Sequence, residues 1–305
     1  METLRWTRHP ALRSPIVIAA FAGWNDAGDA ASGAIRHLSE AWETQAFCDI
    51  DPEEFFDFTE ARPQVMIDHD QAETAAGGRR IVWPVNVFEE GTVAADAGGG
   101  GSDIVLLQGT EPQLRWRTFA AAVAEVAESL GASMVVTAGA LLADVTHRRP
   151  VRVTGSAADP ELARSLHLLP SNYEGPTGIV GVLHDTLAQR NIPSVSLWAS
   201  VPHYVSQAPS PKAALAIVDR IGTLTGLPVD TSAYDDAVAQ YEKRVEEVVN
   251  GDEVARAYVE QLEKAEDEAA EAGAEQLRDL AHLEAGFNAD RLAEEAERYL
   301  RRHGP

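Results

Sequence analysis

Cysteine, basic side chains and long apolar runs are all scarce in this chain. Its 305 residues include one cysteine, Cys48, so no internal disulfide and no cysteine-paired metal site is expected. A single cysteine is typical of a reducing compartment, so we expect a cytoplasmic protein. No segment approaches the roughly 20 apolar residues that cross a bilayer. The apolar run after Arg13 continues directly into a capped helical pattern, which favours a core strand over a signal peptide.

Positive charge is low relative to negative charge. Lysine and arginine number 25 against 48 aspartates and glutamates, which gives a formal net charge of −23. Nucleic acid and anionic membranes are therefore not expected as partners, since both need clustered lysine and arginine. The phosphate-loop, zinc-protease and serine-hydrolase motifs are missing from the sequence. We expect no metal and no cofactor.

Strand-like and helix-like segments alternate up to about residue 226. This alternation predicts an α/β fold in three layers, with a mostly parallel sheet and helices on both of its faces. The expected strands are 16–22, 46–50, 64–67, 80–88, 103–107, 134–137 and 195–199, and the expected helices are 27–42, 116–130, 160–166, 177–189 and 211–225.

The composition changes after Pro228. From Asp235 onward the sequence holds 20 acidic and 9 basic residues, mixed with alanine and leucine. Apolar residues recur there at helical spacing, and glycines near 251, 273 and 286 predict breaks between helices. We therefore expect a core domain over residues 1–230 and an acidic helical C-terminal region over 231–305. The narrow apolar stripes favour packing on the core or on another subunit over a solvated tail.

Polar residues follow several of the predicted strands, where open α/β sheets build their sites. Seven of them form a candidate pocket: Asn25, Asp26, Glu111, Asp144, His147, Glu174 and His203.

Two pairs within this set have a specific interpretation. Asn25 and Asp26 favour helix capping over ligand binding, because a carboxylate at a helix start repels phosphate. Asp144 and His147 have the spacing of a carboxylate–imidazole pair, although most such pairs are structural hydrogen bonds.

A second set of residues is a candidate interface. Three phenylalanines lie beside carboxylates at Phe55, Phe56 and Phe58, and such aromatic density indicates packing or an interface, with packing favoured. Arg115 and Arg117 follow another strand. They fit either an anion clamp or ion pairs with the acidic loop around the phenylalanines.

Six segments together resemble a known family. They are residues 21–28 (FAGWNDAG), 50–59 (IDPEEFFDFT), 62–63 (RP), 139–144 (GALLAD), 173–179 (YEGPTGI) and 196–204 (SLWASVPHY). In this order they resemble the proteasome assembly chaperone 2 family in its actinobacterial form, over roughly residues 14–230.

The resemblance implies an α/β/α core like that of nucleoside phosphorylases and related hydrolases. It also implies homo-oligomers, with a trimer preferred, and protein partners such as proteasome subunits. Relatives that dock on proteasome rings can end in a hydrophobic residue, tyrosine and any residue. The last residues of this sequence are Arg302, His303, Gly304 and Pro305, so docking by that route is not expected.

Two functions follow from these observations. The first is a non-catalytic interaction or assembly-chaperone-like protein, which surface-exposed phenylalanines at 55, 56 and 58 would support. The second is a small-molecule protein, nucleoside-binding or hydrolase/phosphorylase-like, that uses the strand-end pocket; it requires the seven candidate residues to converge.

Overall fold

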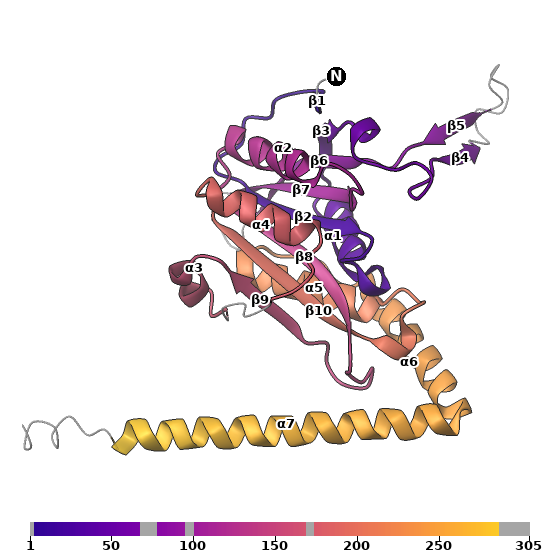
Figure 1. Cartoon of the computed structure of the whole chain (residues 1–305), viewed down its shortest axis with the longest axis vertical. Coiled ribbons are helices and arrows are strands. Elements are labelled where there is room, and N and C mark those ends of the chain that lie inside the picture. The colour runs from indigo at the N-terminus through magenta and orange to yellow at the C-terminus, as the bar shows by residue number, and fades with distance from the viewer. Residues whose placement is uncertain (1–2, 68–77, 95–100, 169–173, 287–305) are drawn as a thin grey trace, which may run out of the picture. The chain divides into compact units, whose positions relative to one another are not determined.

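The computed structural model describes residues 3–67, 78–94, 101–168 and 174–286, with side chains described up to residue 269 (Figure 1). The chain divides into two compact units, residues 1–246 and 247–305. The boundary between the two units, after Glu246, falls later in the sequence than the change in composition after Pro228. The glycine-rich run that begins at Gly98 lies almost entirely outside the described residues.

An eight-stranded sheet forms the centre of the first unit, in the order β1-β3-β6-β7-β2-β8-β10-β9. Its strands are β1 (Leu4–Trp6), β2 (Ile16–Ala22), β3 (Gln45–Ile50), β6 (Asn86–Val93), β7 (Ser102–Thr110), β8 (Met134–Ala143), β9 (Val153–Ala157) and β10 (Ser194–Pro202). The four neighbours β7, β2, β8 and β10 run parallel, and the strands outside them pair antiparallel. The expectation of a mostly parallel sheet therefore holds for these central strands, within a mixed sheet.

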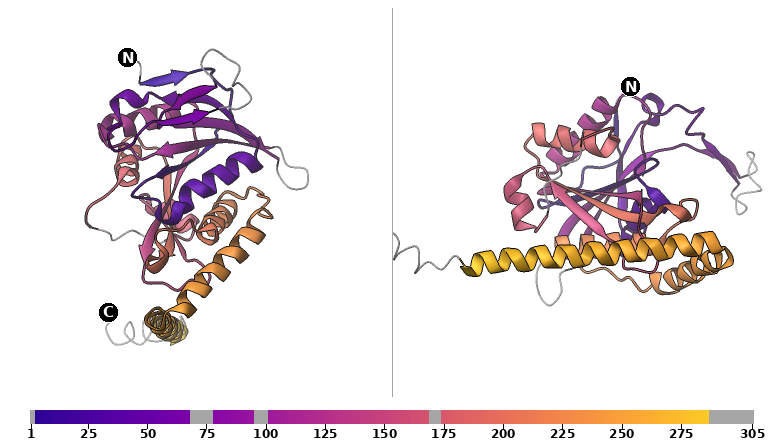
Figure 2. Two further views of the ribbon diagram at one scale, coloured as in Figure 1. Left: turned by 90° about the vertical axis from the view of Figure 1, so that its right-hand side faces the viewer. Right: turned by 60° about the horizontal axis from the view of Figure 1, so that its bottom comes forward.

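Helices cover both faces of this sheet (Figures 1 and 2). They are α1 (Ala30–Ala41), α2 (Trp116–Ser129), α3 (Pro160–Ser165), α4 (Ile179–Gln189) and α5 (Pro211–Thr225), with short 3-10 turns at Ala27–Asp29, Pro52–Glu54 and His203–Val205. The α/β/α prediction is confirmed.

Side-chain alternation along β2 explains the two faces. Ile18 and Ala20 pack in the cluster that contains α1 and α5, whereas Val17, Ala19 and Phe21 pack in the cluster that contains α2 and α4. All five side chains are buried, because a central parallel strand is covered on both sides. The uncharged run that predicts this strand reflects that double burial.

One predicted strand is divided in the structure. Residues 80–88 belong to β5 (Arg79–Val82) and β6, which lie in different sheets on either side of Pro84. Proline lacks the N–H that a ladder requires, and it ends β5 here. β5 pairs antiparallel with β4 (Gln64–Ile67) in a separate two-stranded sheet. The strands β1 and β9 were missed because both are short and lie at the sheet edges.

The C-terminal region is helical, as predicted. Its helices are α6 (Tyr234–Gly251) and α7 (Glu253–Gly286). The break near residue 251 is confirmed, but a break at Gly273 is wrong because α7 continues through it. In the apolar stripe, Tyr241 and Val245 of the first unit are buried, whereas Val248 is 69% exposed.

Candidate functional site

Glu111 joins three segments where the central strands end. Its carboxylate accepts hydrogen bonds from Asn25 Nδ2 at 2.8 Å and from the backbone N–H of Ile179 at 2.9 Å. It also accepts from the backbone N–H of Trp24 at 3.3 Å. Ile179 is the first residue of α4, so Glu111 occupies the positive end of that helix. A ligand anion at this helix end would have to displace it.

Two glycines allow this close approach. Gly23 directly follows β2 and has a backbone φ of 134°, a conformation that residues with side chains rarely adopt. A Cβ atom at Gly178 would lie 2.3 Å from Asn25 Oδ1 and 2.8 Å from Glu111 Oε1. Asn25 itself is only 1% exposed, and its Oδ1 has no hydrogen-bond partner among the described residues. The contacts of Asn25 and Glu111 thus require glycine at positions 23 and 178, in the turns that follow β2 and precede α4.

Asp26 occupies the positive end of a second helix. Its Oδ1 accepts from the N–H of Ala31 at 2.7 Å and from the N–H of Ser32 at 3.3 Å, both in the first turn of α1. Burial raises the pKa of the Asp26 carboxyl, although hydrogen bonds from Ser32 and Ala31 lower it. The capping interpretation agrees with these contacts for Asp26 but not for Asn25, whose side-chain amide donates to Glu111. α5 is also capped from within the chain, by Ser210 Oγ.

His147 lies in a network with Glu246, in the C-terminal half of α6. Its Nδ1 is 2.7 Å from the hydroxyl of Tyr204, and its Nε2 is 2.9 Å from a carboxylate oxygen of Glu246. Arg148 also contacts Glu246, with 2.9 Å between the guanidinium and Oε1. Burial lowers the pKa of His147, although Glu246 raises it. This network links the loop after β8 to α6 and fills the hydrogen-bonding capacity of the imidazole.

Asp144 pairs with a different histidine from the predicted one. Its Oδ1 lies 3.2 Å from Nδ1 of His203, and the Asp144 side chain is 82% exposed. Both residues follow the ends of adjacent parallel strands, β8 and β10, which brings them together despite their separation in sequence. Glu174 is exposed. The seven candidates thus divide among separate contacts rather than converging in one pocket.

The candidate interface residues differ in burial. Phe55 and Phe56 are 1% and 3% exposed, so the surface exposure that would support a docking role is absent there. They pack in the core cluster with α2, where Phe55 contacts Phe119 edge to face. Phe58 is half-buried against Trp83, with ring centroids 4.8 Å apart.

The two arginines also differ. Arg115 pairs with Glu54, as the acidic-loop alternative predicts. Arg117 lies exposed in the first turn of α2.

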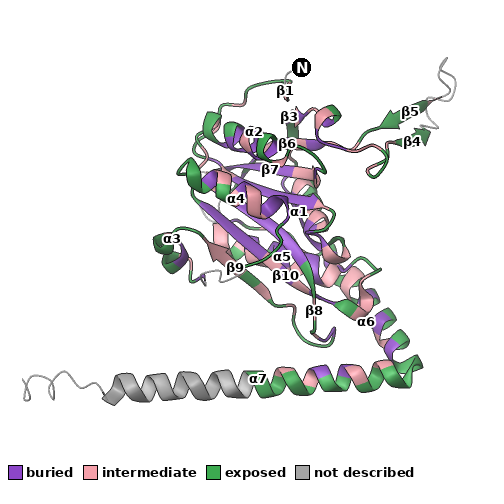
Figure 3. Cartoon of the chain, viewed as in Figure 1, coloured by how far each residue is buried: buried purple, intermediate pink, exposed green. Residues whose placement is uncertain are grey.

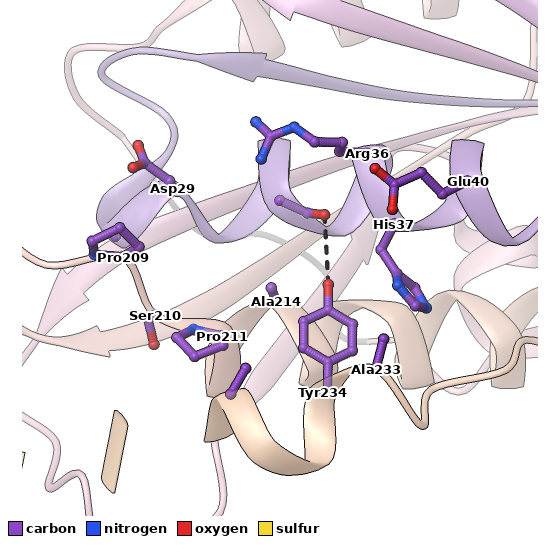
Figure 4. Close-up of a pocket in the computed structure, with 13 residues that line it drawn as sticks. Asp29, Arg36, His37, Glu40, Pro209, Ser210, Pro211, Ala214, Ala233 and Tyr234 are labelled. Carbon is purple, nitrogen blue, oxygen red and sulfur yellow. Dashed lines mark hydrogen bonds between the residues drawn. The ribbon is translucent and has the colours of Figure 1, made fainter. Parts of the chain in front are cut away.

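A cavity of about 360 Å³ lies between α1, α5 and α6 (Figure 4). Polar groups from Arg36, His37, Glu40 and Tyr234 line it. The Tyr234 hydroxyl donates to the Gly33 carbonyl at 3.5 Å, and His37 Nε2 lies 2.7 Å from the Asp230 carbonyl. None of the seven candidates lines this cavity. Sequence reasoning missed it because its residues lie on helix surfaces, with no strand-end signal.

Large apolar side chains are exposed on the loops at the strand ends. Trp24 in the turn after β2 is 69% exposed, and Leu114 in the loop after β7 is 47% exposed. Leu141 and Leu142, at the end of β8, are 43% and 48% exposed. These four residues share a position at or after the carboxyl ends of β2, β7 and β8, and we use the name edge patch for that set. Trp24, Leu141 and Leu142 lie in the sequence segments around Gly23 and Asp144. From the sequence, the polar residues of those segments are interpreted as a candidate pocket, and exposure of the apolar residues is not predicted.

Comparison with known proteins places this architecture in a family. The model of the PAC2 family matches residues 20–249, which is most of the chain. The chain belongs to the PAC2 family. No curated protein sequence matches it. Among the described residues, no group of metal-ligating side chains gathers as a metal site does, and no helix is long and apolar enough to span a membrane.

Solved structures of relatives agree in sequence and in fold. A PAC2 family protein from Streptomyces avermitilis is 41% identical, covering 80% of this chain and 99% of its own, with a TM-score of 0.73. The proteasome-assembly chaperone homologue Rv2125 of Mycobacterium tuberculosis is 37% identical with the same coverage and a TM-score of 0.69. PbaB of Pyrococcus furiosus, an archaeal proteasome activator, is 17% identical with a TM-score of 0.64, covering 81% of this chain and 98% of its own. At that identity, PbaB shows a shared fold only.

Proposed function

We propose that this protein is a non-catalytic assembly factor that binds proteasome core subunits through the edge patch. Its relative in Mycobacterium tuberculosis is described as a proteasome-assembly chaperone homologue at 37% identity. In this chain, the observation that carries the proposal is the edge patch itself. The strand ends hold four large apolar side chains that are exposed, and exposed apolar groups of this size favour a protein-binding surface.

The charged groups at the same edge support a binding role over catalysis. Glu111 and Asp26 occupy the N-termini of α4 and α1, the places where a phosphate or a phosphorolysis substrate would bind. His147 is held by Tyr204 and Glu246. An anionic group at either helix end would have to displace one of these carboxylates, so the alternative of a phosphorylase-like site in a strand-end pocket has less support.

We further propose that the protein acts in the cytoplasm as a homo-oligomer, with a trimer preferred. A ring of identical subunits would present several copies of the edge patch to a multi-subunit client, which raises avidity without new contacts. The residues of the edge patch are uncharged, and a polyanion would need basic side chains to bind there. The patch therefore fits a protein partner better.

The test is binding of purified proteasome core subunits from the organism that encodes this chain. Truncating a tryptophan that is a hot spot of an interface costs about 2 kcal/mol or more, so with Trp24 in that role Trp24→Ala with Leu142→Ala should weaken binding about 30-fold. The matched control is Val248→Ala with Val254→Ala, two valines that are 69% and 79% exposed in the second unit. No binding by the unmodified protein, or equal binding by both double variants, would contradict the proposal.

Native mass spectrometry of the same preparations examines the enzyme alternative. A mass that includes a stoichiometric small molecule, together with no bound subunit, would favour a ligand-binding function. The expected spectrum shows the protein with proteasome subunits and no such molecule.

A further inference from the structure

The edge patch residues lie at the ends of three neighbouring parallel strands, β7, β2 and β8. Each of these strands is buried along its middle and becomes more exposed at its carboxyl end (Figure 3). Trp24 lies in the turn after β2, and its side chain is 69% exposed. An exposed side chain contributes little burial to anchor its own turn, so the conformation of this turn depends on hydrogen bonds to its neighbours.

Glu111, in the loop after β7, holds this turn. Its Oε2 accepts a hydrogen bond from the N–H of Trp24 at 3.3 Å, and its Oε1 accepts one from Asn25 Nδ2 at 2.8 Å. The N–H of Glu111 donates in turn to the carbonyl of Ala22 at 2.8 Å. Three contacts with one residue therefore connect the turn over residues 22–25 to the end of β7.

The same contacts reach β8 and α4. The carbonyl of Asn25 accepts from the N–H of Ala140 at 2.8 Å, directly before Leu141 of the edge patch. On its other side, Glu111 Oε1 accepts from the N–H of Ile179 at 2.9 Å. We call Glu111, Asn25 and the N–H groups of Trp24 and Ile179 the Glu111 clamp. Two members of the edge patch are thus presented by one hydrogen-bonded unit.

The clamp is closely packed. Asn25 is 1% exposed and directs its NH2 group to the carboxylate, so its Oδ1 faces Gly178 without a hydrogen-bond partner among the described residues. A Cβ atom at Gly23 would lie 3.2 Å from the Cβ atom of Glu111. A buried amide oxygen without a partner costs free energy. The arrangement therefore orders the turn at a cost in stability, which is typical of residues that serve binding rather than folding.

Order in this turn favours binding. A partner that buries a tryptophan on a flexible loop has to order that loop as well, which weakens the complex. A turn that is already fixed avoids this loss. Tryptophan is also a side chain that commonly dominates the energy of an interface, so its position matters more than that of most residues.

We infer that Glu111 is a positioning residue for client binding, which holds the Trp24 turn in the conformation that the client recognises. Its carboxylate acts through the turn and makes no contact with the client. This inference rests on the proposed function, since it concerns the same edge patch, and it identifies the residue that pre-organises that patch. A carboxylate with a structural role alone would change stability and leave the affinity for the client unchanged.

The first experiment compares two glutamine variants of the full chain. Glu111→Gln keeps the shape of the side chain, but one of its oxygen atoms becomes an NH2 group, which cannot accept from the clamp. Glu89→Gln is the matched control, because Glu89 also accepts from three groups, none of which belongs to the clamp: Ser39 Oγ and Thr44 Oγ1 at 2.6 Å and Gln108 Nε2 at 2.8 Å. The affinity for purified proteasome core subunits should fall roughly 10-fold in the first variant and remain unchanged in the second.

Hydrogen exchange measures the order of the turn directly. The N–H of Trp24 donates to Glu111, and the N–H of Asp26 donates to the carbonyl of Gly23 at 3.1 Å. Both N–H groups should exchange roughly 10-fold faster in Glu111→Gln, whereas those of β10 should exchange as in the unmodified protein. The turn should show no change in Glu89→Gln.

Acetate provides a rescue experiment. Substitution of Glu111 by alanine removes a CH2 group and a carboxylate, which together have the size of acetate, and leaves the three donors of the clamp in place. In Glu111→Ala, excess acetate should restore both the slow exchange of the Trp24 turn and the affinity for the client. Chloride at the same ionic strength is the control and should restore neither.

The outcomes separate this inference from the proposed function. Weaker binding with faster exchange in Glu111→Gln alone supports the inference, and so does rescue by acetate. Equal affinity of Glu111→Gln and the unmodified protein, weaker binding in both glutamine variants, or acetate that restores slow exchange without affinity overturns it and leaves the proposed function in place. Absence of any binding by the unmodified protein contradicts the proposed function itself. The glutamine variants decide the inference where the alanine variant does not fold.

Discussion

At the scale of single residues, His184 makes the fold sensitive to acid. Its imidazole lies between Thr137 Oγ1 at 2.7 Å and Ser194 Oγ at 2.9 Å, and burial lowers its pKa from 6.5 to about 4. The unfolded chain takes up a proton near pH 6.5, whereas the folded chain does not until about pH 4. The free energy of unfolding should therefore fall by about 3 kcal/mol as the pH decreases through this interval.

Denaturant titrations between pH 7 and pH 4 measure this effect. His184→Gln keeps a side chain that forms hydrogen bonds but removes the titration, so its stability should fall less steeply with acid. His9→Gln, at an exposed histidine, serves as the control and should follow the unmodified protein. Parallel curves for all three proteins would contradict the assignment.

At the scale of an element, the start of α4 depends on the absence of a side chain at Gly178. A Cβ atom there would enter the space of Asn25 Oδ1 and Glu111, at 2.3 and 2.8 Å. Gly178→Ala should separate Glu111 from the helix and lower the free energy of unfolding by about 2–3 kcal/mol. The comparison is Gly33→Ala within α1, where a Cβ atom would lie 3.7 Å from Ala214 and should cause no loss. Equal stability of the two variants would show that the Glu111 contacts are weak.

Elements were predictable to different degrees. The pattern in residues 16–22 specified a buried strand, because both faces of β2 are covered and every position is apolar. The same pattern could not separate β5 from β6, since a short apolar run does not reveal which sheet it joins. The continuation of α7 through Gly273 was missed because one glycine costs a long helix only about 1 kcal/mol.

At the scale of the whole molecule, α6 belongs to the first unit through Glu246, which is most of its length. Tyr241 and Val245 are 3% and 5% exposed, and Glu246 contacts His147. Deleting residues 235–305 removes this burial, which is worth several kcal/mol, and should lower the melting temperature by about 10 °C. Deleting residues 247–305 leaves it in place and should change the melting temperature little.

Scanning calorimetry of the two truncated chains checks this difference. Equal melting temperatures would contradict the assignment of α6 to the first unit. Native mass spectra of the same chains test the separate prediction that removal of residues 235–305 changes the oligomeric state.

The sequence by itself determined the α/β class, the helical C-terminal region and the family resemblance. These properties depend on local periodicity and on short motifs, which are visible along one chain. It also indicated that Asp26 caps a helix, since capping involves residues only a few positions apart. Only the tertiary structure paired Asp144 with His203 and left Trp24 exposed beside a satisfied Glu111. Each of those outcomes depends on strands that are distant in sequence and adjacent in the sheet, and periodicity does not encode that adjacency.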